Sequence, residues 1–148
     1  MAHIDAVQPR PDGTLAVTIT GQRRFRLAEV VQNRPYMVGL VQPLDEVEGG
    51  DLRGPMDEAV TLAQNTLRRM LGLNGEWSNR VPLPRDPARL SYALAERLPL
   101  DVQPRQELLE ARTTFERLMR ELPLLRHELE RADGLLAQRA WLASLVLN

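Results

Sequence analysis

The amino-acid sequence predicts an α+β fold in which an antiparallel β-meander comes first and a helical part follows. Up to about residue 43, apolar and polar residues alternate with the period of two that is typical of strands. Further along, apolar residues recur every three to four positions, as they do on one face of a helix. We therefore expect a meander over residues 1–43, an acidic, glycine-rich and solvated linker over 44–54, and a helical subdomain over 55–148.

Four strands are expected in the first part. Residues 3–8 and 14–20 form a hairpin around a Pro-Arg-Pro-Asp-Gly turn, in which Pro fixes φ and Asp-Gly supplies a left-handed position. Residues 22–32 and 36–43 form two longer strands around Asn33-Arg34-Pro35. In residues 22–32, Val30 and Val31 put apolar groups on both faces, which suits a strand that bends around a barrel corner. In residues 36–43 both faces carry apolar residues, which predicts a largely buried strand.

The first two helices are marked by their end signals. Pro55 suits a first helical position and opens a helix of about 17 residues, which stops near Gly72. Asp86 is an N-cap followed by Pro87, and the helix that they open closes at Pro99.

The remaining helices are marked in the same way. Asp101 is the expected cap of a short helix, and residues 113–116 (Thr-Thr-Phe-Glu) are a capping box that opens a longer one. Pro123 lies inside this longer pattern, so we expect a kink or a break there. Residues 133–147 are predicted to form a separate last helix.

The composition excludes several classes of chemistry. All 19 basic residues are Arg, which rules out Schiff-base chemistry, a Ser–Lys dyad and a P-loop lysine. The absence of Cys rules out disulfides, thiol nucleophiles and Cys-bound metals. The net charge of −1 gives no overall attraction to nucleic acid or an anionic membrane. Because no apolar run reaches membrane-spanning length and no signal peptide is visible, we expect a cytoplasmic location.

No catalytic, metal or cofactor site is expected. His3 and His127 are far apart, and neither has an acidic residue at ligand spacing. Asp45, Glu46 and Glu48 are close in sequence, but we predict that they are solvated in a flexible loop rather than held in a catalytic pair. The Ser and Thr residues have no visible base beside them.

Two stretches of the chain resemble the N-terminal, substrate-binding domain of the Lon ATP-dependent proteases. GQRRFRLAEVVQNRPYMVGLVQPLDE is similar to its strand pair, and RLSYALAERLPLDVQPRQELLEARTTFERL to its helical part. The second stretch contains three short segments that follow one another in the same order and at the same spacing as in the family: Leu90-Ser91-Tyr92, Leu98-Pro99-Leu100 and Gln106-Glu107-Leu108-Leu109-Glu110. The resemblance covers roughly residues 3–131.

The resemblance implies a PUA-like β-barrel followed by a helical subdomain, a unit that helps Lon to recognise unfolded or damaged polypeptides. The ATPase and Ser–Lys protease modules that follow it in Lon are not found in this sequence, so we expect no enzyme activity. The family's first strands, with a proline- and phenylalanine-rich segment, are also not found. This predicts a partial barrel, explained by a true start that lies upstream or by a shortened domain. Its unpaired strand edges predict a homodimer or a domain-swapped assembly.

Few side chains stand out as candidate binding residues. Phe25, Tyr36 and Met37 are candidates for contacting a polypeptide, and Trp77 is either a partner anchor or a lid on the core. Arg23, Arg24 and Arg26 have two interpretations, a phosphate-binding patch or the solvated outer face of a strand, and we favour the second.

The leading hypothesis is a non-catalytic polypeptide-binding domain, linked to protein quality control or degradation, that offers apolar surface and strand edges to unfolded or extended chains. One alternative is a PUA-like RNA-binding module that uses the three arginines, although the net charge of −1 does not favour a nucleic-acid partner. Another is an oligomerising adaptor without a client of its own.

Overall fold

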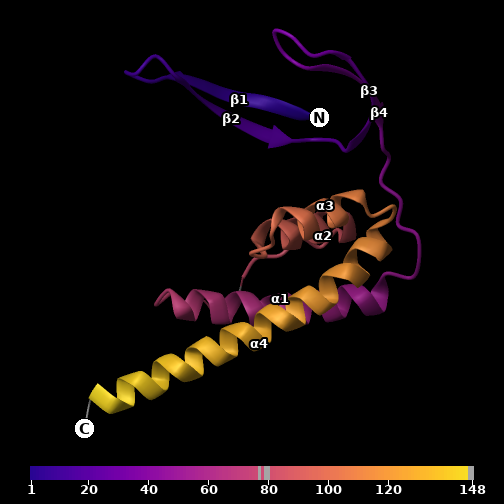
Figure 1. Cartoon of the computed structure of the whole chain (residues 1–148). Helices are drawn as coiled ribbons and strands as arrows, with labels where there is room; N and C mark the ends of the chain where they lie inside the picture. Colours follow the sequence, from indigo (N-terminus) through magenta and orange to yellow (C-terminus); the bar gives the residue numbers. More distant parts are fainter. Residues whose placement is uncertain (77, 79–80, 147–148) are drawn as a thin grey trace. The chain divides into compact units, whose positions relative to one another are not determined.

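The computed structural model describes residues 1–76, 78 and 81–146. The chain divides into two compact units, Met1–Asp45 and Glu46–Asn148. The described part of the first unit contains strands and that of the second contains helices, which confirms the predicted α+β class (Figure 1). Trp77 lies outside the described residues.

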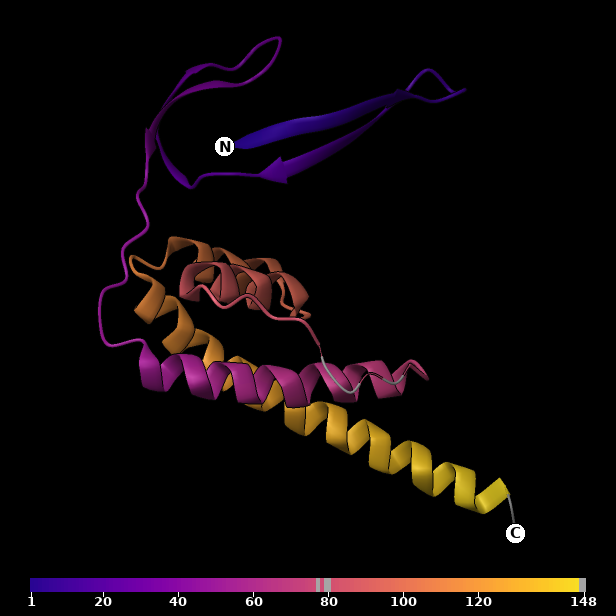
Figure 2. The same ribbon diagram turned by 180° about the vertical axis from the view of Figure 1, so that it is seen from behind.

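The first unit consists of two antiparallel hairpins. β1 (Ala2–Pro9) pairs with β2 (Leu15–Gly21), and β3 (Phe25–Gln32) pairs with β4 (Val38–Pro43). The four predicted strands are thus confirmed. In the described part of the chain the hairpins form two separate two-stranded sheets, which are not closed into a barrel (Figure 2).

The helical unit contains four helices within its described residues: α1 (Arg53–Leu73), α2 (Pro87–Arg97), α3 (Val102–Glu110) and α4 (Thr114–Val146). The predicted capping side chains of α2 and α4 are present, whereas Asp101 precedes α3 at the N-cap position but makes no side-chain cap hydrogen bond. The Asp86 carboxylate accepts a hydrogen bond from the backbone N–H of Arg89 (2.8 Å) at the start of α2. Thr113 Oγ1 accepts from the backbone N–H of Glu116 (3.1 Å) at the start of α4.

The predicted break near Pro123 is wrong, because α4 continues through it. Residues 133–147 are therefore not a separate helix; those described belong to the end of α4. Pro123 lacks an N–H and removes one helical hydrogen bond. Leu118, Leu122 and Leu125 on both sides of it are buried in one cluster, and this packing holds the helix together across the missing bond.

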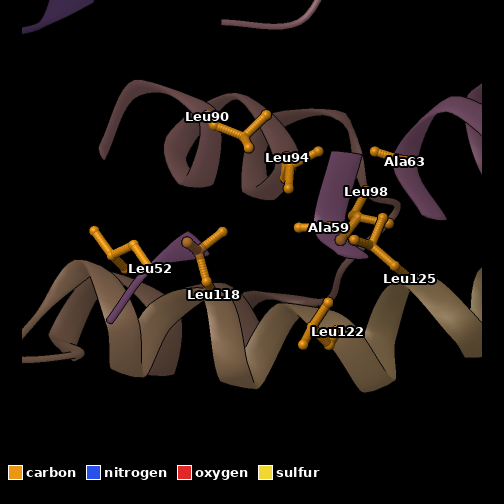
Figure 3. Packing of buried hydrophobic residues seen from close by; sticks show 9 residues of the cluster. All are labelled: Leu52, Ala59, Ala63, Leu90, Leu94, Leu98, Leu118, Leu122 and Leu125. Atoms are coloured by element: carbon orange, nitrogen blue, oxygen red, sulfur yellow. The ribbon is translucent and has the colours of Figure 1, made fainter. Parts of the chain in front are cut away.

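The core of the helical unit lies between α1, α2 and α4 (Figure 3). Ala59 and Ala63, one turn apart on α1, have no exposed surface, and such small residues let α1 and α4 approach closely. Thr66 extends this contact, because its hydroxyl donates to the carbonyl oxygen of Leu125 (3.2 Å). The buried apolar cluster consists of Leu52, Ala59, Ala63, Leu90, Leu94, Leu98, Leu118, Leu122 and Leu125.

Candidate functional site

The first hairpin has one apolar face. In the β1–β2 register Ile4 lies opposite Ile19, and Val7 lies opposite Val17. Ile4 and Val7 are three positions apart and would point to opposite faces of a regular strand. The register shift around Asp5 supplies an extra residue, which brings both onto the same face. These four side chains are exposed, as is that of Leu15, which lies on the same face two residues before Val17.

The bulge residue Asp5 also organises the polar side chains of this hairpin. Its carboxylate accepts a hydrogen bond from Thr20 Oγ1 (2.6 Å) and lies 3.0 Å from His3 Nδ1. These two hydrogen bonds, that from Thr20 first, lower the pKa of Asp5. The hydrogen bond from Thr20 ties the bulge of β1 to β2.

The second hairpin repeats the arrangement. Leu27 lies opposite Val41, and Val30 lies opposite Gly39, with register shifts around residues 28 and 31. A Cβ on Gly39 would collide with the Leu27 side chain, so Leu27 covers the backbone of β4 at this point. Leu27, Val30 and Val41 are all exposed.

Those predicted binding residues that the structure describes are exposed but do not form one cluster. Phe25 begins β3, whereas Tyr36 and Met37 lie in the connection between β3 and β4, at the other end of the hairpin. Trp77, the fourth of them, falls in the undescribed part. The predicted burial of residues 36–43 is wrong, since Leu40 and Val41 are exposed. The sequence reasoning also did not identify the exposed apolar residues of the strands as a candidate surface: Ile4, Val7, Leu15, Val17, Ile19, Leu27, Val30, Leu40 and Val41.

The three arginines do not form one face of a strand. Arg23 and Arg24 precede β3, and Arg26 lies within it, where it pairs with Gln42. Arg23 Nη2 donates to Asp45 Oδ1 (2.6 Å) in an exposed ion pair, and the carbonyl oxygen of Arg24 accepts from the backbone N–H of Leu44 (3.0 Å). The arrangement ties the base of the second hairpin and gives little support to a phosphate site.

Glu46 is partly exposed to solvent, but its carboxylate is held in place rather than free in a flexible loop. Its carboxylate accepts hydrogen bonds from Tyr92 Oη (2.7 Å), Thr114 Oγ1 (2.8 Å) and Arg117 Nη2 (2.9 Å). Partial burial is the largest single influence and raises the pKa of Glu46, but the hydrogen bonds from Tyr92, Thr114 and Arg117 lower it overall. Glu46 is therefore a structural carboxylate that joins α2 to the start of α4.

Arg117 is the centre of this network and is fully buried. Its guanidinium donates to Ser91 Oγ (2.8 Å) and to the carbonyl oxygen of Leu108 (3.2 Å), and it lies 4.1 Å from the centroid of the Tyr92 ring. The side chain thus connects α2, the end of α3 and the start of α4 with Glu46. No feature of the sequence pattern separated it from the exposed arginines.

The backbone after Glu46 is held against the start of α4. The carbonyl oxygens of Val47 and Glu48 accept from the N–H groups of Thr114 (2.8 Å) and Phe115 (2.9 Å), which have no partner within the helix. Gly49 has a φ of +81°, and a Cβ there would collide with the Thr113 side chain. The acidic, glycine-rich composition of this segment therefore reflects close packing as well as solvation.

The described residues contain no cluster of three or more His, Asp or Glu side chains arranged to hold a metal ion. Within the same part of the chain, none of the helices combines the length and apolar character needed to cross a bilayer.

Comparison with known proteins identifies a family. The model of the ATP-dependent protease La (LON) substrate-binding domain matches residues 1–127. Lon protease 2 of Herpetosiphon aurantiacus is 29% identical over 144 residues, which cover 88% of this chain and 16% of that protein. Lon protease of Brevibacillus choshinensis is 27% identical over 132 residues, which cover 88% of this chain and 17% of that protein. The chain thus spans about a sixth of the length of these relatives.

A solved structure agrees with the family match. The crystal structure of a Lon N-terminal domain protein from Xanthomonas campestris superposes with a TM-score of 0.61 at 27% sequence identity, and the match covers 82% of this chain and 64% of that one. The resemblance seen in the sequence is confirmed.

Proposed function

The chain belongs to the family of the Lon substrate-binding domain, and on that premise we propose that it is a non-catalytic polypeptide-binding domain linked to protein quality control or degradation. The matched relatives are proteases, and the family model that matches this chain describes their substrate-binding part. We do not propose that this chain hydrolyses ATP or cleaves peptides. We place the protein in the cytoplasm.

The observation that carries the proposal is the pair of amphipathic hairpins. Each presents an exposed apolar face, and in a two-stranded sheet each strand has one edge that pairs with no other strand. An extended polypeptide can pair its backbone with such an edge while its side chains contact the apolar face. Both interactions suit unfolded chains of many sequences, because the backbone bonds are common to all of them.

Replacing Phe25 by Asp is expected to weaken the binding of an unfolded polypeptide about tenfold. Phe25 is an exposed apolar residue at the start of β3, and a carboxylate in its place would have to be desolvated when a chain covers it. The measurement is the fluorescence anisotropy of a labelled, permanently unfolded polypeptide titrated with each variant.

Arg26→Asp is the matched control, because Arg26 is the next residue of β3, points to the opposite face and is also exposed. It should bind the unfolded chain like the unmodified protein.

A second variant, Tyr36→Ser with Met37→Ser, changes the connection outside the strand pairing and is also expected to bind more weakly. If Phe25→Asp and the double variant Tyr36→Ser with Met37→Ser both bind the unfolded chain like the unmodified protein, the proposed surface is wrong. Binding of RNA that weakens steeply with salt and is lost in Arg26→Asp would favour the RNA-binding alternative instead.

We also expect a homodimer that forms through an exposed strand edge. Two-stranded hairpins are marginally stable alone, and pairing with a second copy adds strands to the sheet. Sedimentation equilibrium should give twice the mass of one chain, and a monomer at every concentration would contradict this. A dimer that ignores unfolded polypeptides would favour the adaptor alternative.

A further inference from the structure

The helical unit contains a cavity that the proposed function does not use. It has a volume of about 460 Å³ and is formed mainly by α2 and α3, with Arg117 of α4 at one side. This size lies in the range of ligand-binding cavities and accommodates a large side chain together with part of a backbone. The Tyr92 ring, with the Arg117 guanidinium against it, forms one wall. The apolar side chains of the lining are Ala95, Leu100, Val102, Leu108 and Leu109.

One face of α3 is turned to this cavity. Val102, Arg105, Gln106 and Leu109 all line it, and their spacing of three, four and seven places them on one side of the helix. Val102 is 86% exposed and Leu109 is 47% exposed. The helix therefore holds apolar side chains in contact with water at the mouth of a cavity, an arrangement that favours the binding of apolar matter.

The polar groups of the cavity indicate what else the ligand contains. Glu96, Arg105 and Gln106 line it with one carboxylate, one guanidinium and one amide. Arg105 Nη2 donates to the carbonyl oxygen of Leu100 (3.4 Å) and Gln106 Nε2 donates to Glu110 Oε1 (2.7 Å). The acceptors offered to a ligand are the Glu96 carboxylate and Gln106 Oε1, and the donors are the other N–H groups of Arg105. The charges of Glu96 and Arg105 balance, and the charge of Arg117 is paired with Glu46. A cavity without net charge does not select phosphate groups or nucleic acid. It is complementary to a neutral backbone with alternating N–H and C=O groups.

We infer that this cavity binds one bulky apolar side chain of an extended polypeptide, while Glu96, Arg105 and Gln106 hydrogen-bond to the peptide groups beside it. The inference rests on the proposed polypeptide-binding function and deepens it. It gives the helical unit a contact of its own with the substrate and a preference for chains that carry large apolar residues.

The test compares two neutral, fluorescein-labelled Gly/Ser peptides, one with a single Phe and one with Ser in its place. The unmodified protein should bind the Phe peptide more tightly. Leu109→Asp should weaken the binding of the Phe peptide about tenfold and leave the Ser peptide unaffected, because only the Phe side chain enters the cavity. Val102→Asp, at a more exposed position, should act in the same direction without disturbing the folded core.

Leu142→Asp is the matched control, since Leu142 is 49% exposed, lies on α4 and is not part of the cavity lining. It introduces the same charge and should leave both affinities unchanged. Far-UV circular dichroism verifies that each variant is folded.

The place of binding can be read directly from a peptide in which benzoyl-phenylalanine replaces the Phe. After irradiation and trypsin cleavage at the arginines, the adduct should be attached to residues 90–97, 98–105 or 106–112, which contain the lining residues of α2 and α3. Adducts confined to residues 1–45 would overturn the inference.

The outcomes separate the two proposals. If Phe25→Asp weakens binding while Leu109→Asp and Val102→Asp bind like the unmodified protein, the cavity subsite is wrong and the polypeptide-binding function stands. If the unmodified protein binds neither the Phe peptide nor unfolded polypeptides, both are wrong. A change of oligomeric state in Leu109→Asp without a change in peptide affinity would overturn the inference in favour of a contact between copies.

Discussion

Replacing Glu121 by Gln is expected to stabilise the protein at neutral and alkaline pH and to remove most of the decline in its stability above pH 5. Glu121 lies on α4 and has no exposed surface. Neither of its carboxylate oxygens has a hydrogen-bond partner among the described residues. Burial raises the pKa of Glu121 from 4.5 to about 9, although the charge of Arg117 acts in the opposite direction.

The raised pKa fixes the sign of the pH dependence. Between pH 4.5 and about 9 the folded chain holds a proton on Glu121 that the unfolded chain has released. Protonated Glu121 therefore costs the folded state nothing below pH 4.5. As the pH rises from 4.5 towards 9, the free energy of unfolding falls. At pH 7.5 protonation of the buried acid costs about 4 kcal/mol, of which Gln should recover on the order of 2–4 kcal/mol.

Urea unfolding at pH 5, 7 and 9 measures this effect. The unmodified protein should lose stability steadily over this range, and Glu121→Gln should vary much less. Glu130→Gln makes the same change of charge at an exposed position of the same helix and should follow the unmodified protein. A flat profile for the unmodified protein, or equal slopes for it and Glu121→Gln, would show that Glu121 is not a buried neutral acid.

The burial of Glu121 and Arg117 marks the limit of the sequence reasoning for the helices. By its helical spacing Met119 belongs to the apolar face of Leu118 and Leu122, yet Met119 is exposed while Arg117 and Glu121 are buried. The face of α4 is rotated towards these two residues because Arg117 finds its partner in Glu46, 71 positions earlier in the chain. Periodicity treats every charged residue as solvated and carries no information about partners so distant in sequence.

In the strands the sequence predicted the elements but not their surroundings. Alternation over residues 14–20 places Leu15, Val17 and Ile19 on one face of the predicted strand, and in β2 these residues do share a face. The extra residue at Asp5, which aligns Ile4 and Val7 with them, has no signal in the alternation of so short a strand. Alternation also does not tell whether an apolar face is covered, since covering depends on other segments or other molecules. The candidate surface therefore became visible only in the structure.

Replacing Arg117 by Met is expected to destabilise the protein by on the order of 3 kcal/mol. The methionine fills much of the volume but donates no hydrogen bonds. Ser91 and the carbonyl oxygen of Leu108 lose a donor, and Glu46 keeps a charge without its cationic partner. Since Glu46 is partly exposed, water can solvate some of that charge, which limits the loss.

Urea unfolding of three variants separates these contributions. Arg120→Met removes an exposed guanidinium one turn away, which pairs with Glu116 at 2.6 Å, and should cost less than about 1 kcal/mol. The double variant Arg117→Met with Glu46→Gln should recover part of the loss, because it removes the unpaired charge as well. Equal losses in Arg117→Met and Arg120→Met would contradict the central position of Arg117.

The pH profile of Arg117→Met provides a readout that a loss of packing alone would not change. Arg117 contributes a positive charge close to Glu121 that favours the ionised carboxylate, and so it opposes the effect of burial on the pKa of Glu121. Without it, Glu121 should keep its proton to higher pH, and the decline in stability should extend further into the alkaline range. A profile that is lowered uniformly, with its shape unchanged, would mean that the two side chains are not coupled. A profile that is both lowered and extended would show that one buried guanidinium neutralises Glu46 and also limits the penalty of burying Glu121.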